Sequence, residues 1–379
     1  MSKLKNILKK MAILFGSLVL LLSISVVLFV NFSPQMGGSA TKAQKALFEK
    51  SNNYENKVFV NPDGIKMSLD FNKTIKAISG FFGPQPNTSP QIPILVMQLD
   101  STEVADYLGP TRLVWFGHSA FLLQIAGKTI LLDPMFGDVP APLPMLGAKR
   151  FSAKLPMAIE KLPKIDAVIL SHDHYDHLDY GSIKLLKDKT NMFFAPLGVG
   201  AHLVEWGIAE DHVVELDWWQ EVPLENITLK CTPAQHFSGR GFTDRGKTLW
   251  SSWVVQSANE NIFFSGDSGY GPHFKEIGEK YGPFDFAMME CGQYNTLWKE
   301  IHMMPEETAQ AGIDIRARTI MPIHWGAFKL AMHPWTEPVE RLAVKAQQLN
   351  IDMVTPKIGE SFLIGSDQGY RSKWWTAFN

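Results

Sequence analysis

Four potential metal ligands lie within six consecutive positions near the middle of the chain. The segment SHDHYDHLD, residues 171–179, brings together His172, His174, Asp176 and His177 in a chain with only 11 histidines among 379 residues. Neutral imidazole offers a lone pair near physiological pH, and a neighbouring carboxylate adds negative charge that helps to hold a divalent cation. The spacing therefore predicts a metal site, with a polar loop of unrelated histidines as the alternative.

The residues before and after this segment predict how it is positioned. The run IDAVIL, residues 165–170, is short, apolar and β-branched, which is typical of a fully buried strand. The ligands would then lie in the loop at the carboxyl end of a strand, where a rigid sheet fixes the start of an accessible loop. In the following YGSIKLLKDK, Ile183, Leu185 and Leu186 have helical spacing and predict a helix.

Three further candidates follow apolar runs in the same way. His236 follows NITLKCTPAQ, Asp267 follows NIFFSG and His324 follows TIMPI. Alone, each has an ordinary interpretation, as a hydrogen-bonded histidine or a turn-forming aspartate. With the first cluster they make a set of five histidines and two aspartates.

These motifs carry a resemblance to a known family. The HxHxDH pattern resembles the metal motif of the metallo-β-lactamase superfamily. Other stretches resemble its N-acylphosphatidylethanolamine-hydrolysing phospholipase D branch, and together they cover roughly residues 106–365: GHSAFL, LLDPMF, GAKRF, ELDWW, TPAQHFSGR, LWSSWVV, FFSGDSGY, YGPFD and IHWGAF. The resemblance implies an α/β fold, the four-layer αβ/βα metallo-β-lactamase sandwich, with metals at one edge between two sheets.

The resemblance also implies a binuclear ligand set. It assigns His172, His174 and His236 to one ion, Asp176, His177 and His324 to a second, and Asp267 to a bridge between them. Two ions about 3.5 to 4 Å apart can share a water, lower its pKa and present hydroxide as a nucleophile. This gives Asp176 and Asp267 catalytic as well as metal-binding roles. Imidazole and carboxylate ligands suit two Zn²⁺ ions, while Mn²⁺ or Fe²⁺ stay open.

Three residues outside this set also have counterparts in the family. Asp133 ends the strand-like KTILLD, where the family carries a carboxylate that supports the metal loop; an Asp-Pro turn is the alternative. His118 in WFGHS stays outside the ligand set because it can equally be a core histidine. His302 in KEIHMMPEE matches a histidine near the substrate pocket, so we expect it to protonate a leaving group or contact phosphate. It also precedes the helix-start pattern MPEE, which gives an ordinary alternative.

One departure from the family concerns the substrate. Where related phospholipases read roughly PIGAYEPRWF, this chain reads MECGQYNTLW at residues 289–298, without the arginine. A guanidinium recognises phosphate with two parallel hydrogen bonds, so its absence leaves the particular phospholipid open.

The amino-terminal segment predicts a membrane anchor. Residues 11–30 form twenty uncharged positions, enough to cross about 30 Å of hydrocarbon and longer than the apolar core of a signal peptide. Four lysines precede them, so the positive-inside rule predicts a cytoplasmic basic tail at 1–10, a transmembrane anchor at 11–30 and an extracytoplasmic catalytic domain. We expect a linker and extension at 31–105 and the hydrolase domain at 106–379. Cleavage of a signal near Ala40 is the alternative.

Composition narrows the class of protein further. The chain is 45% hydrophobic and 20% charged, with net charge −2 and no basic stripe, which argues against a nucleic-acid partner. Cys231 and Cys291 are too few for a disulfide framework, and their pairing stays open.

The aromatic FFG at 81–83 and the WWTAF near the carboxyl terminus could contact lipid or fill a core. Strand-like runs are expected at 121–125, 128–132, 165–170, 226–232, 250–256, 261–265 and 285–289.

The sequence therefore predicts a membrane-anchored, zinc-dependent hydrolase. The expected reaction is cleavage of a phosphodiester by metal-bound hydroxide, with an N-acylphosphatidylethanolamine-like lipid as substrate. A lactonase or esterase acting on a small ester, such as a sugar-phosphate lactone, is the enzymatic alternative. The third hypothesis is a non-catalytic anchored binding module. The sequence does not predict the oligomeric state. GDSG at 266–269 lacks the spacing of a serine nucleophile elbow.

Overall fold

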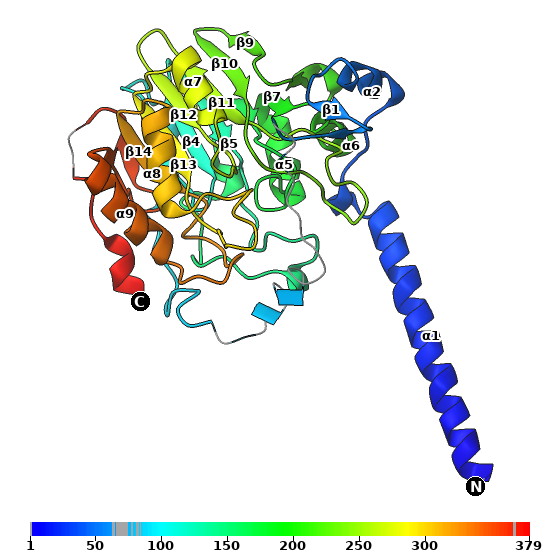
Figure 1. Ribbon diagram of the computed structural model, residues 1–379. Helices are drawn as coiled ribbons and strands as arrows, with labels where there is room; N and C mark the ends of the chain where they lie inside the picture. Colours follow the sequence, from blue (N-terminus) through cyan, green and yellow to red (C-terminus); the bar gives the residue numbers. More distant parts are fainter. Residues whose placement is uncertain are drawn as a thin grey trace.

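Two seven-stranded mixed sheets pack against each other, with helices on both outer faces (Figure 1). The computed structural model describes residues 2–379 apart from 63–64, 66–74, 77–78, 81–82, 84 and 367–368. The expected four-layer αβ/βα sandwich is confirmed.

The first sheet has the strand order β16-β3-β4-β5-β6-β7-β8. Its strands are β3 (Arg112–Trp115), β4 (Phe121–Ile125), β5 (Lys128–Leu132), β6 (Ile165–Ile169), β7 (Thr190–Pro196), β8 (Val213–Leu216) and β16 (Ser361–Leu363). Strands β5 to β8 run parallel, and the others pair antiparallel. Helices α5 (Tyr180–Leu186) and α6 (Gly200–Glu205) pack on the outer face. In α5, Ile183 and Leu186 are buried as the pattern predicts, whereas Leu185 is exposed.

The second sheet has the order β15-β14-β13-β12-β11-β10-β9. Its strands are β9 (Glu221–Leu224), β10 (Ile227–Thr232), β11 (Ser252–Gln256), β12 (Asn261–Phe264), β13 (Phe286–Glu290), β14 (Thr319–Ile323) and β15 (Asp352–Met353). The helices on its outer side are α7 (His273–Tyr281), α8 (Pro305–Asp314) and α9 (Glu337–Leu349). Strands β12 to β15 run parallel, and β10 points the same way because two antiparallel pairings separate it from β12.

Alternating side chains divide the core into layers. In β12, Ile262 and Phe264 face the core between the sheets, while Phe263 packs under the outer helices. In β4, Phe121 and Leu123 face inward and Leu122 faces outward. Both faces of these strands are buried, which explains why they read as continuous apolar runs in the sequence. All seven expected strand ranges coincide with strands, namely β4, β5, β6, β10, β11, β12 and β13.

The amino-terminal region combines a projecting helix with elements that pack on the sandwich. Helix α1 (Ser2–Phe32) extends away from the domain (Figure 1), with its apolar side chains exposed and a mean hydropathy of 2.9 over its most apolar window. Helix α2 (Lys42–Phe48) and the hairpin of β1 (Tyr54–Glu55) and β2 (Val58–Phe59) follow, with α4 (Ser101–Ala105) further on. Phe48 and Phe59 are buried in the core between the sheets. Part of the expected linker and extension therefore builds the domain.

The remaining elements with bounds in the described part of the chain are short 3-10 helices. They are η1 (Pro34–Met36), η3 (Pro144–Leu146), η4 (Ile159–Lys161), η5 (Lys187–Lys189), η6 (Glu210–His212) and η7 (Trp374–Phe378). In η7, the side chains of Trp374, Trp375 and Phe378 are buried in the core, so WWTAF fills the interior. Phe81 and Phe82 of the FFG segment lie outside the described residues. Cys231 and Cys291 are both free and buried.

Candidate metal centre

The chemistry-bearing side chains come together because each follows a strand whose carboxyl end meets the same edge of the sandwich. The histidine-rich loop follows β6, while His236, Asp267 and His324 follow β10, β12 and β14 of the other sheet. The Ser251 N–H donates to the Ser171 carbonyl at 2.9 Å, and the Trp253 indole donates to the Leu170 carbonyl at 2.9 Å. These bonds join the two sheets beside the histidine-rich loop.

Three histidines form the first group, as expected for one ion. His172 Nε2 and His236 Nε2 lie 2.9 and 3.2 Å from His174 Nδ1. One ligand atom from each lies within 4.8 Å of the others, close enough to hold a cation together. The His236 Nδ1–H donates to the Ile301 carbonyl at 3.0 Å, so this ring carries its proton on Nδ1 and keeps the Nε2 lone pair for the cluster.

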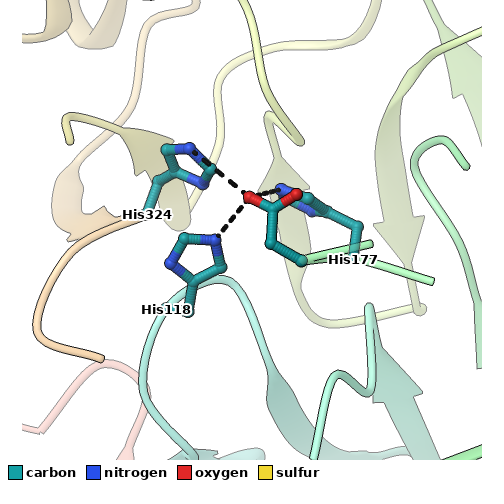
Figure 2. A group of neighbouring side chains, drawn as sticks. His118, His177 and His324 are labelled. Atoms are coloured by element: carbon teal, nitrogen blue, oxygen red, sulfur yellow. Dashed lines mark hydrogen bonds and ion pairs between the residues drawn. The ribbon is translucent and has the colours of Figure 1, made fainter. Parts of the chain in front are cut away.

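The second group contains the three expected residues and His118. The rings of His118, His177 and His324 point toward one another (Figure 2), and their Nε2 atoms lie 2.9, 3.5 and 3.9 Å from Asp176 Oδ2. His118 is fully buried, and its ring approaches the Asp176 carboxylate more closely than the other two. His118 therefore lies in the cluster, although it is not among the ligands expected from the sequence.

Asp267 lies between the two groups. Its Oδ2 is 3.9 Å from His172 Nε2 and 3.8 Å from His236 Nε2, while its Oδ1 is 3.1 Å from His324 Nδ1. Asp267 Oδ1 and His177 Nε2 are buried and make no hydrogen bond of normal geometry with a described residue, although His324 Nδ1 and Asp267 Oδ2, respectively, lie 3.1 Å from them. Buried polar atoms without partners are costly in free energy, so these two atoms fit the role of ligands to a cation. The structure brings Asp267 close to histidines of both groups, and its role as a bridge stays a prediction.

The electrostatics of the cluster also suit metal binding. Burial holds the pKa of His172, His236 and His324 well below its ordinary value, which keeps these imidazoles neutral. Burial alone would raise the pKa of Asp176, but His177 and His118 hold it well below its usual range. Burial likewise opposes the shift of His177, whose pKa is raised by Asp267, Asp176 and Asp133. The carboxylates therefore favour positive charge at the position of His177, as a cation site requires.

Asp133 supports the histidine-rich loop directly. Its Oδ2 accepts a hydrogen bond from His177 Nδ1 at 2.7 Å, and its Oδ1 accepts one from the Ser171 N–H at 2.7 Å. The first bond places the His177 proton on Nδ1 and aims Nε2 into the cluster. This is the supporting position that the sequence resemblance implies.

His302 lines a cavity of about 260 Å³ beside the two groups. Its Nδ1 lies 3.3 Å from Oε1 of Glu290, the last residue of β13, and its ring stacks on His324 at 5.2 Å between centroids. Burial raises the pKa of Glu290 to about 7, and Glu290 in turn raises the pKa of His302 against the effect of burial. The pair therefore holds a proton at the cavity wall. The helix-start interpretation of MPEE is confirmed, because α8 begins at Pro305, whereas the catalytic role of His302 stays a prediction.

Comparisons with known proteins agree with this geometry. Residues 128–325 match the model of the Beta-lactamase superfamily domain. An uncharacterized protein of Mycobacterium tuberculosis is 40% identical over 336 residues, which cover 86% of this chain and 88% of the relative. N-acyl-phosphatidylethanolamine-hydrolyzing phospholipase D 1 of Caenorhabditis elegans is 34% identical over 263 residues, covering 65% and 74%.

A solved structure shares the fold at lower identity. A possible metal-dependent hydrolase from Veillonella parvula aligns with a TM-score of 0.54 and 17% identity, over 67% of this chain and all of the other. The fold and the His/Asp cluster are those of a metal-dependent hydrolase. The chain belongs to the metallo-β-lactamase superfamily and, within it, to the branch of the N-acylphosphatidylethanolamine-hydrolysing phospholipases D.

Proposed function

We propose that this protein is a membrane-anchored hydrolase with two divalent metal ions that cleaves the phosphodiester of an N-acylphosphatidylethanolamine-like lipid. The products are phosphatidic acid and an N-acylethanolamine. One observation carries the proposal: two ligand groups share Asp267 beside a cavity. One ion is assigned to His172, His174 and His236, and the other to Asp176, His177 and His324, with His118 beside Asp176. Zinc is the preferred ion for these ligands.

The chain's own residues supply positioning and proton transfer. When bound, two ions polarise the phosphoryl group and lower the pKa of a water molecule. Asp267 holds the two ligand groups at a fixed separation, and Asp133 fixes the orientation of His177. His302 is engaged by Glu290 through Nδ1, so its Nε2 is available to donate a proton to the departing ethanolamine oxygen.

The lining of the cavity supports a substrate with apolar parts. Phe237, Trp298, Ile301 and Leu330 contribute apolar surface next to the histidines. Such walls exclude water from the reacting group and can contact an acyl chain.

A second candidate function rests on the same lining. Among the described residues that line this cavity there is no lysine or arginine, so a neutral ester or lactone would also be accommodated. Two metal ions activate acyl substrates by the same polarisation of an oxygen. A lactonase or esterase is therefore the alternative that the experiment has to separate.

Helix α1 supports the anchoring part of the proposal. It is long and apolar enough to cross a bilayer, and none of its most apolar window is buried in the protein. Four lysines at its start support, by the positive-inside rule, a cytoplasmic amino terminus and an extracytoplasmic catalytic domain. An anchored enzyme meets a lipid substrate at high effective concentration.

A substrate panel tests the proposal. The full chain in neutral detergent would be analysed for metal content and assayed on N-acylphosphatidylethanolamine vesicles, bis(p-nitrophenyl) phosphate and lactones. Phosphodiester cleavage that disappears in Asp267→Asn but persists in the control Asp188→Asn, at an exposed position, is the expected result. Turnover of lactones alone would favour the second candidate. A protein with two bound ions and no turnover of any substrate would favour a binding module.

A further inference from the structure

A second cavity, of about 780 Å³, adjoins the candidate metal centre. His236 and Phe237 form walls of both cavities. The far side is built by the amino-terminal extension, with Val58 and Phe59 of β2 among its lining residues. The second cavity therefore begins directly beside a candidate metal ligand.

The wall formed by the amino-terminal extension is tied to the metal centre through Asn61. The Asn61 Oδ1 accepts hydrogen bonds from the His236 N–H and the Trp250 indole, both at 3.0 Å. The Asn61 Nδ2 donates to the His236 carbonyl at 2.8 Å. Through these three bonds, the side-chain amide of Asn61 fixes the amino-terminal wall of the second cavity relative to His236.

Arg245 provides a cationic group between the two cavities. Its guanidinium lies over the ring of Phe237 at 4.0 Å, and that ring lies 4.5 Å from the His174 ring and 4.9 Å from the His236 ring. The Arg245 side chain has no hydrogen bond or ion pair with any described residue. Burial lowers the pKa of the Arg245 guanidinium.

Arg240, five residues before Arg245, differs from it in its hydrogen bonds. Its guanidinium donates to the carbonyls of Asp173, Leu178 and Gln35, so its hydrogen-bonding capacity is used within the protein. None of the described residues accepts a hydrogen bond from the Arg245 guanidinium, and a guanidinium can bind two oxygens of a phosphate at once.

We infer that Arg245 and the second cavity form an anion-binding subsite beside the metal cavity, which takes the phosphate monoester that the reaction releases or free phosphate. This inference rests on the proposed function in its choice of phosphate. The metal cavity presents Asp176 and Asp267, and none of the described residues that line it is a lysine or an arginine. Arg245 supplies a guanidinium from the loop after β10.

Binding of inorganic phosphate tests the subsite without requiring turnover. Calorimetric titration of phosphate into the metal-loaded full chain in neutral detergent should show binding at least about tenfold weaker in Arg245→Gln than in the unmodified protein, because a charge-assisted contact is lost. Arg245→Lys should fall between the two, since lysine keeps the charge and loses the paired geometry. Equal phosphate affinity in Arg245→Gln, or no phosphate binding by the unmodified protein, would overturn the inference.

A matched control and a separate assay keep this outcome independent of the proposed function. Arg318 is exposed and immediately precedes β14, whose opposite end carries His324, so Arg318→Gln makes the same charge change far from the centre and should leave phosphate affinity unchanged. If phosphate binding depends on Arg245 while bis(p-nitrophenyl) phosphate is not cleaved, the subsite stands and the phosphodiesterase proposal fails. If this diester is cleaved and Arg245→Gln binds phosphate normally, the proposed function stands and the subsite fails.

Discussion

The backbone N–H of His324 donates to the carbonyl of His118 at 3.1 Å, although the two residues follow strands of different sheets, β14 and β3. The His118 N–H in turn donates to the Trp325 carbonyl at 3.1 Å. Both histidines have a left-handed backbone, with φ of 58° at His118 and 65° at His324, which is uncommon outside glycine. The sheets are thus joined at the candidate metal centre by a strained pair of turns that place both imidazoles beside Asp176.

Replacing His118 should weaken the second metal position. In His118→Asn the backbone can keep its left-handed conformation, but Asp176 loses its nearest partner. We expect affinity for one of two ions to fall by about 10- to 100-fold, as when other supports of metal ligands are removed. Elemental analysis after dialysis at graded metal concentrations measures this loss. Two tightly held ions in the variant would contradict it, and His212→Asn, at an exposed histidine, is the control.

The sequence predicts most of the site because its ligands follow strands with clear apolar patterns. His118 could not be assigned in this way, because its proximity to Asp176 depends on contact between the two sheets. Glu290 was not singled out because it is the last residue of the buried strand β13 and carries no motif of its own. Strand β9 contains a proline and exposed positions, and β15 and β16 have only two and three residues, so periodicity cannot reveal them.

Loss of the His302 side chain should reduce turnover without removing the metals. His302 lines the cavity and pairs with Glu290, so His302→Ala removes the proposed proton donor, and kcat should fall by about 100-fold. Glu290→Gln keeps the imidazole but removes its charged partner, and it should give a smaller loss in the same direction. Steady-state kinetics with parallel metal analysis separates this effect from loss of ions. Unchanged turnover of His302→Ala on every substrate would reject a catalytic role.

Removal of metal should destabilise the protein as well as inactivate it. Asp133, Asp176 and Asp267 surround His177, so their negative charges lose a compensating cation when a chelator is added. Ligand bound at about 1,000 times its Kd stabilises a fold by about 4 kcal/mol, so the Tm should fall clearly. Differential scanning calorimetry before and after chelation, followed by addition of Zn²⁺, Mn²⁺ or Fe²⁺, identifies the ion that restores both Tm and activity. Superimposable melting curves and full activity in chelator would exclude a metal-dependent centre.

Truncation before Ser33 should separate membrane attachment from catalysis. The Pro34 carbonyl accepts a hydrogen bond from the Trp206 indole at 2.7 Å, and the Gln35 carbonyl accepts two from Arg240, so these residues belong to the folded domain. Deleting 2–32 should leave Tm and turnover of soluble substrates unchanged but lower turnover of vesicle lipid by about tenfold or more. Deleting 2–36 removes the carbonyls as well and should lower the Tm. Equal vesicle binding by the full and shorter chains would argue against the anchor.

Glu215 should make the protein less stable as the pH rises through neutrality. Burial raises its pKa to about 7 from an ordinary value of 4.5, even though it accepts a hydrogen bond from the Gly200 N–H at 2.7 Å. A raised pKa in the folded state means that its stabilising contribution is complete below about pH 4.5 and is lost as the pH rises through about 7. Glu215→Gln keeps the acceptor oxygen and cannot ionise, so it should raise the free energy of unfolding at pH 8 by roughly 1 to 3 kcal/mol and change it little at pH 4. Urea denaturation of both proteins at the two pH values measures this effect. At each pH, the difference in unfolding free energy between variant and unmodified protein cancels the contribution of the other titrating groups. A variant that is no more stable at pH 8 would show that the Glu215 carboxylate is accommodated without cost.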